Sequence, residues 1–339
     1  MTLRLAFMLH SVLQGPQWDY SYLSYSPAEL VALIGFYRRL GFEFVKASDF
    51  FAGDSRRVCL TFDDGFLDNW TLLHPLLAER GVPYTVFVCR DFVEPTSTVR
   101  PHGDRTPGYL SQGEIRRMHE SGLADIQSHS VTHTWYPTAE AVVDVFSPAQ
   151  KAKYPWLLWN AEPASKPQWL QADYSRLAGL PVFQNDRSLR ARRFLFDDDK
   201  LAHFQRRVVA DGLNAEQAEL LRRREYGRLG RSETPAEQQA RYEAEIAGNA
   251  DFIDGLLGYR PSVMCWPGGA YNELSEAVAY RFHACTTLPR AYGRDERYMH
   301  RISPGNPYGR DRFPWKHPRL TWALYTLRHA SRSAMGASA

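Results

Sequence analysis

Two short groups of residues combine carboxylates and imidazoles in patterns that can do chemistry. Asp63 and Asp64 are adjacent and precede Gly65, and neighbouring carboxylates raise each other's pKa unless a cation neutralises one of them. His129 and His133 are four residues apart, a spacing at which two imidazoles can meet one ion from the same side of a helical turn. Together these residues can form a metal site of two histidines and one carboxylate, with positions left for water and substrate. Alone, the Asp-Asp-Gly sequence would fit a solvated turn.

The elements that must position these residues follow an α/β pattern. Short apolar runs alternate with helical segments, which is typical of a mainly parallel sheet or barrel. The carboxylates end the run 58–62 and the histidines follow the run 125–127, so both groups belong at carboxyl ends of strands, where α/β folds build their sites. Further strands are predicted at 4–9, 84–88, 262–266 and around 284–287. Capping boxes predict three helices, with the residue pairs Ser26/Glu29, Ser111/Glu114 and Thr234/Glu237.

The composition is that of a folded protein. The chain has 339 residues, 44% of them hydrophobic, which suffices for one large barrel or two ordinary domains. The formal net charge of +3 does not call for a nucleic acid as partner. The four cysteines are widely spaced, so buried free thiols are expected. The first residues lack the features of a cleaved secretion signal, and no stretch is apolar for the length of a bilayer, so a cytoplasmic location is expected.

Residues 61–65 (Thr-Phe-Asp-Asp-Gly) resemble the TFDDG motif of the polysaccharide deacetylases, also called the NodB homology or carbohydrate esterase family 4 group. Residues 129–133 resemble the H-S/T-x-x-H motif of that family, and both motifs stand in the family's order. The resemblance covers about residues 3–134 and 246–302. It implies a distorted (β/α)7 barrel, a metal held by Asp64, His129 and His133, and Asp63 as the catalytic base.

A third family motif, usually R-x-P-Y-G, is altered at residues 265–269. Cys265 stands in place of the Arg that orients the base, and Gly268 stands in place of the Tyr. The oxyanion donor in that motif is a main-chain N–H, which survives a change to glycine, so Gly268 is the expected donor. Arg301, in the last strand-like piece, is the candidate replacement for the missing Arg.

The family's C-terminal L-x-H strand, which supplies the general acid, is also absent from its place. Residues 5–12 instead resemble the opening strand of the circularly permuted members that act on poly-N-acetylglucosamine. The first and last strands of a closed barrel are neighbours, so His10 is the predicted general acid. The alternative is a histidine that only caps the strand.

Residues 136–231 interrupt the barrel pattern between its parts 1–135 and 232–305, and residues 306–339 form a basic tail. The interruption is rich in Pro, Trp and Tyr and then charged and helical over about 201–224, which predicts a mixed, mostly helical insertion. Sugar rings bind to aromatic faces, but core packing explains most aromatic residues equally well. The candidates to contact substrate are Trp156, Trp159, Trp266 and Pro267. Within the tail, residues 318–332 are either an amphipathic helix at a membrane surface or a helix packed on the barrel.

These patterns predict metal-dependent hydrolysis of an N-acetyl group from an amino sugar, with release of acetate. Zinc is the expected ion from nitrogen and oxygen ligands, and cobalt or nickel would fit the same site. The expected partner is a glycan or a lipid-linked or nucleotide-linked N-acetylated sugar. A deacylase for a small amide and an inactive glycan-binding module remain as alternatives. A non-haem iron oxygenase is disfavoured because the close His-x-Asp pair of such sites is not seen.

Overall fold

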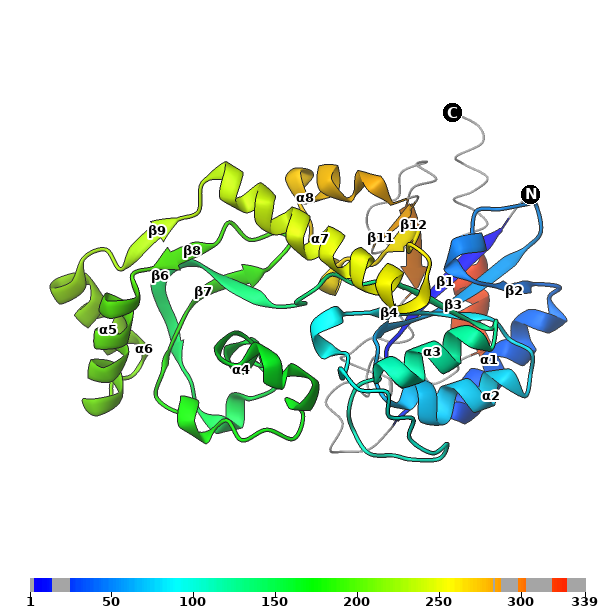
Figure 1. The fold of residues 1–339 in the computed structure, drawn as a ribbon, viewed down its shortest axis with the longest axis horizontal. Coiled ribbons are helices and arrows are strands. Elements are labelled where there is room, and N and C mark those ends of the chain that lie inside the picture. The colour runs from blue at the N-terminus through cyan, green and yellow to red at the C-terminus, as the bar shows by residue number, and fades with distance from the viewer. Residues whose placement is uncertain (1–2, 14–24, 283, 288–297, 303–318, 328–339) are drawn as a thin grey trace.

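The computed structural model describes residues 3–13, 25–282, 284–287, 298–302 and 319–327, and a parallel β-barrel forms the right half of the molecule in Figure 1. The strand order is β1-β12-β11-β10-β5-β4-β3, and β1 also pairs with β3, which closes the barrel. Its strands are β1 (Arg4–Leu9), β3 (Arg57–Asp64), β4 (Tyr84–Val88), β5 (Ala124–Ser128), β10 (Val263–Met264), β11 (Ala284–Thr287) and β12 (Tyr298–Ile302). The predicted fold class, a distorted (β/α)7 barrel, is confirmed.

The barrel is distorted at β3, because β2 and β4 pair one after the other with the same edge of this strand. β1 pairs with β3 over residues 57–62, whereas the short strand β2 (Glu43–Val45) pairs with residues 57–59 and β4 pairs with residues 61–64. Every pairing in this sheet is parallel. The carboxyl ends of these strands therefore meet at one end of the barrel, where the predicted site residues follow them.

Helices cover the outside of the barrel. They are α1 (Pro27–Arg39), α2 (His74–Ala78), α3 (Gln112–Glu120), α7 (Pro235–Leu257) and α8 (Glu273–Val278). The three predicted capping boxes are formed at the starts of α1, α3 and α7, and each Ser or Thr oxygen accepts the backbone N–H three residues later. The four cysteines are free and buried, as expected.

The region predicted as an insertion projects from one side of the barrel (Figure 1). Its frame is an antiparallel hairpin of β6 (Trp135–Val145) and β7 (Pro181–Arg187), with α4 (Trp156–Ala161) between the two strands in sequence. β8 (Phe194–Phe196) and β9 (Gly230–Ser232) form a second antiparallel pair. The charged stretch is two helices, α5 (Asp198–Ala210) and α6 (Ala215–Leu221), because Gly212 adopts a positive φ and Asn214 caps α6.

The tail contains a helix over residues 319–327 that packs on α1. Trp322 is buried, its indole donates to Tyr25 Oη (3.1 Å), and its carbonyl accepts from Tyr37 Oη (3.3 Å). One side of this segment thus packs on the helical layer around the barrel, and the rest of 318–332 lies outside the described residues. Three leucines on the helix stay exposed: Leu320, Leu324 and Leu327. Among the described helices, none has the length and apolar character that a membrane crossing requires.

Candidate active site

The site loops carry unusual backbone conformations. Asp64, Ser130 and His133 have φ values of +73°, +68° and +47°, and they are the non-glycine residues with positive φ in the described part of the chain. Such conformations cost about 1–3 kcal/mol each and persist where the surroundings enforce them, commonly at functional sites. They also correct one expectation, because residues 129–133 form a kinked loop and not a helical turn.

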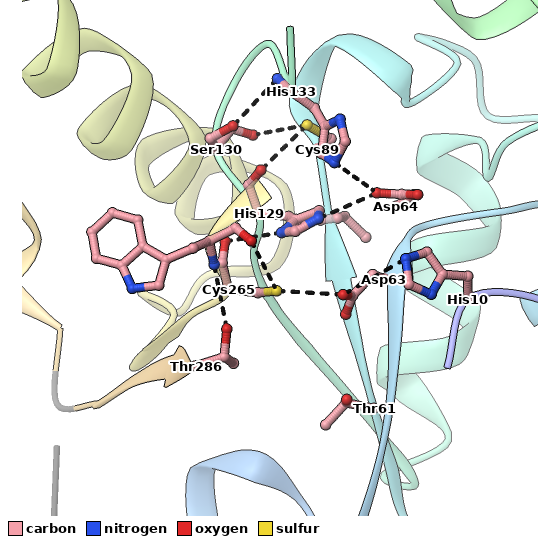
Figure 2. Close-up of polar contacts among 12 residues, drawn as sticks. His10, Thr61, Asp63, Asp64, Cys89, His129, Ser130, His133, Cys265 and Thr286 are labelled. Carbon is pink, nitrogen blue, oxygen red and sulfur yellow. Dashed lines mark hydrogen bonds and ion pairs between the residues drawn. The ribbon is translucent and has the colours of Figure 1, made fainter. Parts of the chain in front are cut away.

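Asp64, His129 and His133 converge at the carboxyl ends of β3 and β5 (Figure 2). Asp64 Oδ1 lies 3.2 Å from His129 Nε2 and 3.3 Å from His133 Nε2, and one ligand atom from each of the three residues lies within 4.8 Å of the others. Asp64 Oδ1 is nevertheless buried without a well-oriented hydrogen bond from any described residue. Polar atoms that converge in this way fit a divalent cation, and the nitrogen and oxygen donors are those that zinc and similar ions accept.

The tautomer of His129 also fits a role as a metal ligand. Its Nδ1 lies 2.9 Å from the carbonyl oxygen of Cys265, which can only accept, so Nδ1 carries the proton. The Nε2 atom is then directed at Asp64. A backbone acceptor that fixes a histidine in this way is the usual support for a metal-ligating imidazole.

The charges of Asp64 and of the two histidines depend on each other. Burial would raise the pKa of Asp64, but His133 and His129 hold it well below its usual value. Burial lowers the pKa of His133 to about 3, although the Asp64 carboxylate opposes that change. The ring of His133 is therefore neutral at physiological pH, which is the form that can bind a metal.

Asp63 points to the other side of the β3 end and is paired with Arg301. Arg301 Nη1 donates to Asp63 Oδ1 (2.5 Å) and Nη2 donates to Oδ2 (2.8 Å), with both side chains about 4% exposed. Nη2 also donates to Cys265 Sγ (2.9 Å), so the small residue at 265 leaves room for the guanidinium. Burial would raise the pKa of Asp63, but Arg301, His10 and His129 keep it below its usual value. Asp63 is therefore a carboxylate.

His10 follows β1 and faces the same carboxylate. Its Nε2 lies 4.0 Å from Asp63 Oδ2, and its backbone carbonyl accepts from Asn69 Nδ2 (3.1 Å). Asp68 fixes the next residues through one carboxylate oxygen, which accepts from Ser11 Oγ (2.5 Å), Val12 N (2.6 Å) and Leu13 N (2.8 Å). Burial lowers the pKa of His10 below 6.5, although Asp63 and Asp64 act in the opposite direction. The imidazole is therefore neutral at neutral pH.

The third motif places Gly268 at an exposed position with φ +55°. A Cβ atom at 268 would overlap the guanidinium of Arg187 at the end of β7, and Arg187 donates to the Gly268 carbonyl. The same guanidinium lies over the ring of Trp135, 5.2 Å from its centroid. The positive φ favours glycine at this position, and the insertion contacts the barrel here through Arg187.

The aromatic candidates are placed in the core. Trp266 is fully buried and stacks on Tyr271 (5.0 Å), so it offers no face to a substrate in this structure, and Pro267 beside it is also buried. Trp156 and Trp159 are 5% and 3% exposed. Trp159 lies 6.3 Å from the ring of His133, so it adjoins the site without an open face. Contact of these residues with substrate stays a prediction.

Sequence reasoning missed two buried charged residues that hold the histidine loop. Glu245 on α7 accepts from Thr132 N (2.9 Å) and Thr132 Oγ1 (2.5 Å). Lys166 donates to the Thr132 carbonyl and lies 3.6 Å from Asp91 Oδ2. Glu245 lies in a segment that is predicted to be helical, but nothing in the sequence links this residue to the histidine loop.

Trp135 is a third residue beside the site that was not predicted from the sequence. It is only half-buried, and its ring lies 6.0 Å from that of His133. Its position two residues after His133 was the available signal.

Comparisons with known proteins concern the family and the fold. Residues 52–153 match the polysaccharide deacetylase family, a region that contains both carboxylates and both histidines. The fold is similar to a de-N-acetylase from Aggregatibacter actinomycetemcomitans (TM-score 0.55, 16% identity, 90% of this chain and 96% of that chain covered). It is also similar to IcaB from Ammonifex degensii (TM-score 0.51, 15% identity, 94% and 98% covered). No curated protein matches the sequence.

Proposed function

We propose that the chain removes the acetyl group from an amino sugar with the help of one divalent metal ion. The premise is that it carries a polysaccharide deacetylase domain and is a hydrolase of amide bonds in N-acetylated sugars. The substrate is a polysaccharide or a glycan precursor, and the products are acetate and a free amine. One observation carries the proposal: a candidate ligand set and an arginine-paired carboxylate meet on adjacent residues of β3.

Asp64, His129 and His133 are the proposed metal ligands, and zinc is the proposed ion, with cobalt or nickel as substitutes. When bound there, the ion would polarise the acetamide carbonyl and acidify the attacking water. The carbonyl contact of His129 and the Glu245 contacts of the loop hold this side of the site in place.

Asp63 is the proposed base. Each of its oxygens accepts one hydrogen bond from Arg301, and Oδ2 accepts a second, weak one from Cys265 Sγ (3.5 Å), so the carboxylate can still accept a proton from water. The bidentate contact holds the carboxylate plane in one orientation, which is the role proposed for Arg301. General base catalysis by such a group contributes about 10²–10⁴-fold.

His10 is the proposed acid, and it enters the reaction neutral. Its Nε2 faces Asp63 Oδ2, so it can take up the proton that Asp63 has removed from water and pass it to the leaving amine. Asn69 and Asp68 position the ring through the backbone of residues 10–13. The Gly268 N–H is the proposed donor to the oxyanion that forms at the carbonyl.

Acetate release tests this proposal. The zinc-loaded chain is expected to release acetate from N-acetylglucosamine oligosaccharides, and Asp63→Asn is expected to lose about 10²-fold or more while it keeps its metal. Asp254→Asn, an exposed change on α7, is the matched control. Release at the wild-type rate by folded, metal-loaded Asp63→Asn would overturn the assignment of the base. Release from small amides but from no sugar would overturn the substrate class.

We also propose that the substrate is lipid-linked and that the tail helix contacts the membrane surface. Leu320, Leu324 and Leu327 lie on one exposed side of this helix, and Trp322 anchors the opposite side to α1. Replacing the three leucines by serine is expected to abolish binding to anionic liposomes without loss of fold. Absence of liposome binding by the intact chain would remove the proposal. The cytoplasmic location and the nucleotide-linked alternative stay predictions.

A further inference from the structure

A cavity of about 420 Å³ lies in the insertion, and Trp156 is the one residue among the predicted site residues that lines it. Its volume is in the range of small-molecule sites, roughly 300–1,000 Å³. Its walls come from β6, β7, β8, α4 and α5, which belong to the insertion beside the barrel (Figure 1).

The lining combines aromatic rings with polar ends. The rings belong to Tyr136, Trp156, Phe183, Phe194 and Phe196. The polar groups belong to Asn160, Arg193, Asp198 and Gln205. A pyranose ring has apolar C–H faces and a rim of hydroxyl groups, so it matches aromatic walls that carry amide and charged groups at their edge.

The walls are already ordered by contacts among themselves. The Arg193 guanidinium lies 4.5 Å from the centroid of the Tyr136 ring. The ring of Phe196 lies 4.5 Å from that of Phe183 and 5.0 Å from that of Phe194. A ligand would therefore meet a preformed surface and would lose little affinity to the ordering of side chains.

Asn160 connects the cavity to the histidine loop. Its Oδ1 accepts from Thr134 Oγ1 (2.7 Å), and its Nδ2 donates to the Trp135 carbonyl (2.8 Å). Thr134 directly follows His133 in the sequence. A ligand held in the cavity is thus held at a fixed place relative to the candidate active site.

We propose that this cavity is a second carbohydrate-binding site, which takes one sugar unit of the glycan at a distance from the unit that loses its acetyl group. The proposal rests on the proposed function, because a polymeric substrate supplies a second unit to bind. An acyl chain suits the cavity less well, since it would bury Arg193 and Gln205 against groups that form no hydrogen bonds. The site anchors long substrates and leaves the chemistry of the acetamide unchanged.

A blocking variant tests the site in the full-length, zinc-loaded chain. Leu201 on α5 lines the cavity, so Leu201→Trp fills it, and Leu220→Trp on α6, at a residue that is 54% exposed, is the matched control. Binding is measured by calorimetry in an Asp63→Asn background, which prevents turnover. The probes are the hexasaccharide and the disaccharide of N-acetylglucosamine, in β-1,4 and β-1,6 linkage.

Leu201→Trp is expected to raise the Kd of the hexasaccharide about tenfold, and Leu220→Trp is expected to leave it unchanged. Acetate release from the disaccharide, measured without the Asp63 change, is expected to be equal in both variants. Equal hexasaccharide affinity in the two variants would overturn the second site. Dodecyl phosphate serves as the probe for an acyl chain. If Leu201→Trp loses binding of dodecyl phosphate while its sugar binding is unchanged, the second site is also overturned.

Failure of the second site and failure of the proposed function give different results. If the wild-type chain releases no acetate but Leu201→Trp still weakens hexasaccharide binding, the proposed function is wrong and the cavity is still a sugar site. If acetate is released and neither tryptophan variant affects binding, the proposed function is supported and the second site is wrong.

Discussion

The two halves of the site differ in how each buried carboxylate is neutralised. Asp63 and Asp64 are adjacent on β3 and point to opposite sides. On its side, Asp63 has the guanidinium of Arg301, a permanent positive charge. On the other side, Asp64 has two imidazoles and no well-oriented hydrogen bond to Oδ1 from the described residues. Asp64 thus lacks a permanent cation of its own, so the Asp64 half is the one that the proposed metal would complete.

The halves also differ in where their partners come from. His129 and His133 follow β5, which is joined to β3 through β4 along the sheet. Arg301 and His10 come from β12 and β1, near opposite ends of the chain, and Ala6 on β1 is the direct neighbour of Arg301 in the sheet. The Asp63 half therefore exists only when the barrel is closed.

Loss of the Asp64 carboxylate is expected to have the largest effect. Asp64→Asn removes the charged ligand, so the chain should purify without zinc and lose several kcal/mol of transition-state stabilisation, about 10³-fold or more in acetate release. Metal content by mass spectrometry is the measurement. Asp63→Asn is the control, because it should lose activity and keep the metal. Equal metal content in the two variants would contradict the division of the site into halves.

Removal of Arg301 is expected to act mainly on stability. Arg301→Met leaves Asp63 buried without its cation, which should lower the free energy of unfolding by about 3–5 kcal/mol in urea titrations. Addition of Asp63→Asn to this variant should restore a large part of that loss, since no buried charge then remains at this position. Strictly additive losses in the double variant would show that the two side chains do not act as a pair.

Much of this site was predictable from the sequence because local patterns specify it. Asp64, His129 and His133 lie in contiguous motifs after apolar strands, and the structure brings them together. Arg301 was a weak candidate because its pairing with Asp63 depends on barrel closure between distant segments. The kinked loop at Ser130 and His133 was not predictable, since its conformation is enforced by Glu245 and Lys166, which are distant in sequence. The burial of Trp266 likewise depends on packing that sequence patterns do not resolve.

The state of His10 is expected to appear in the pH dependence. Burial holds its pKa below 6.5, and only the neutral ring can take up the proton from Asp63. Acetate release should therefore be constant around neutral pH and fall about tenfold per unit as the pH decreases through the lowered pKa. His10→Gln should lose this acid limb. Bound zinc is measured at each pH, and only points with full occupancy are compared. A limb that persists unchanged in His10→Gln would refute the relay.

The smallest effect is expected at Cys265, the residue that replaces the family's arginine. Its thiol accepts from Arg301 Nη2 and donates to Asp63 Oδ2 (3.5 Å). The size of the residue is expected to matter more than its sulfur, because a longer side chain would occupy the place of the guanidinium. Cys265→Ser should thus keep acetate release within about threefold, less than 1 kcal/mol. Cys265→Leu should displace Arg301 and reproduce the loss of stability in Arg301→Met. If serine proves as damaging as leucine, the thiol itself contributes to the Asp63 half, and the arginine alone does not account for its charge.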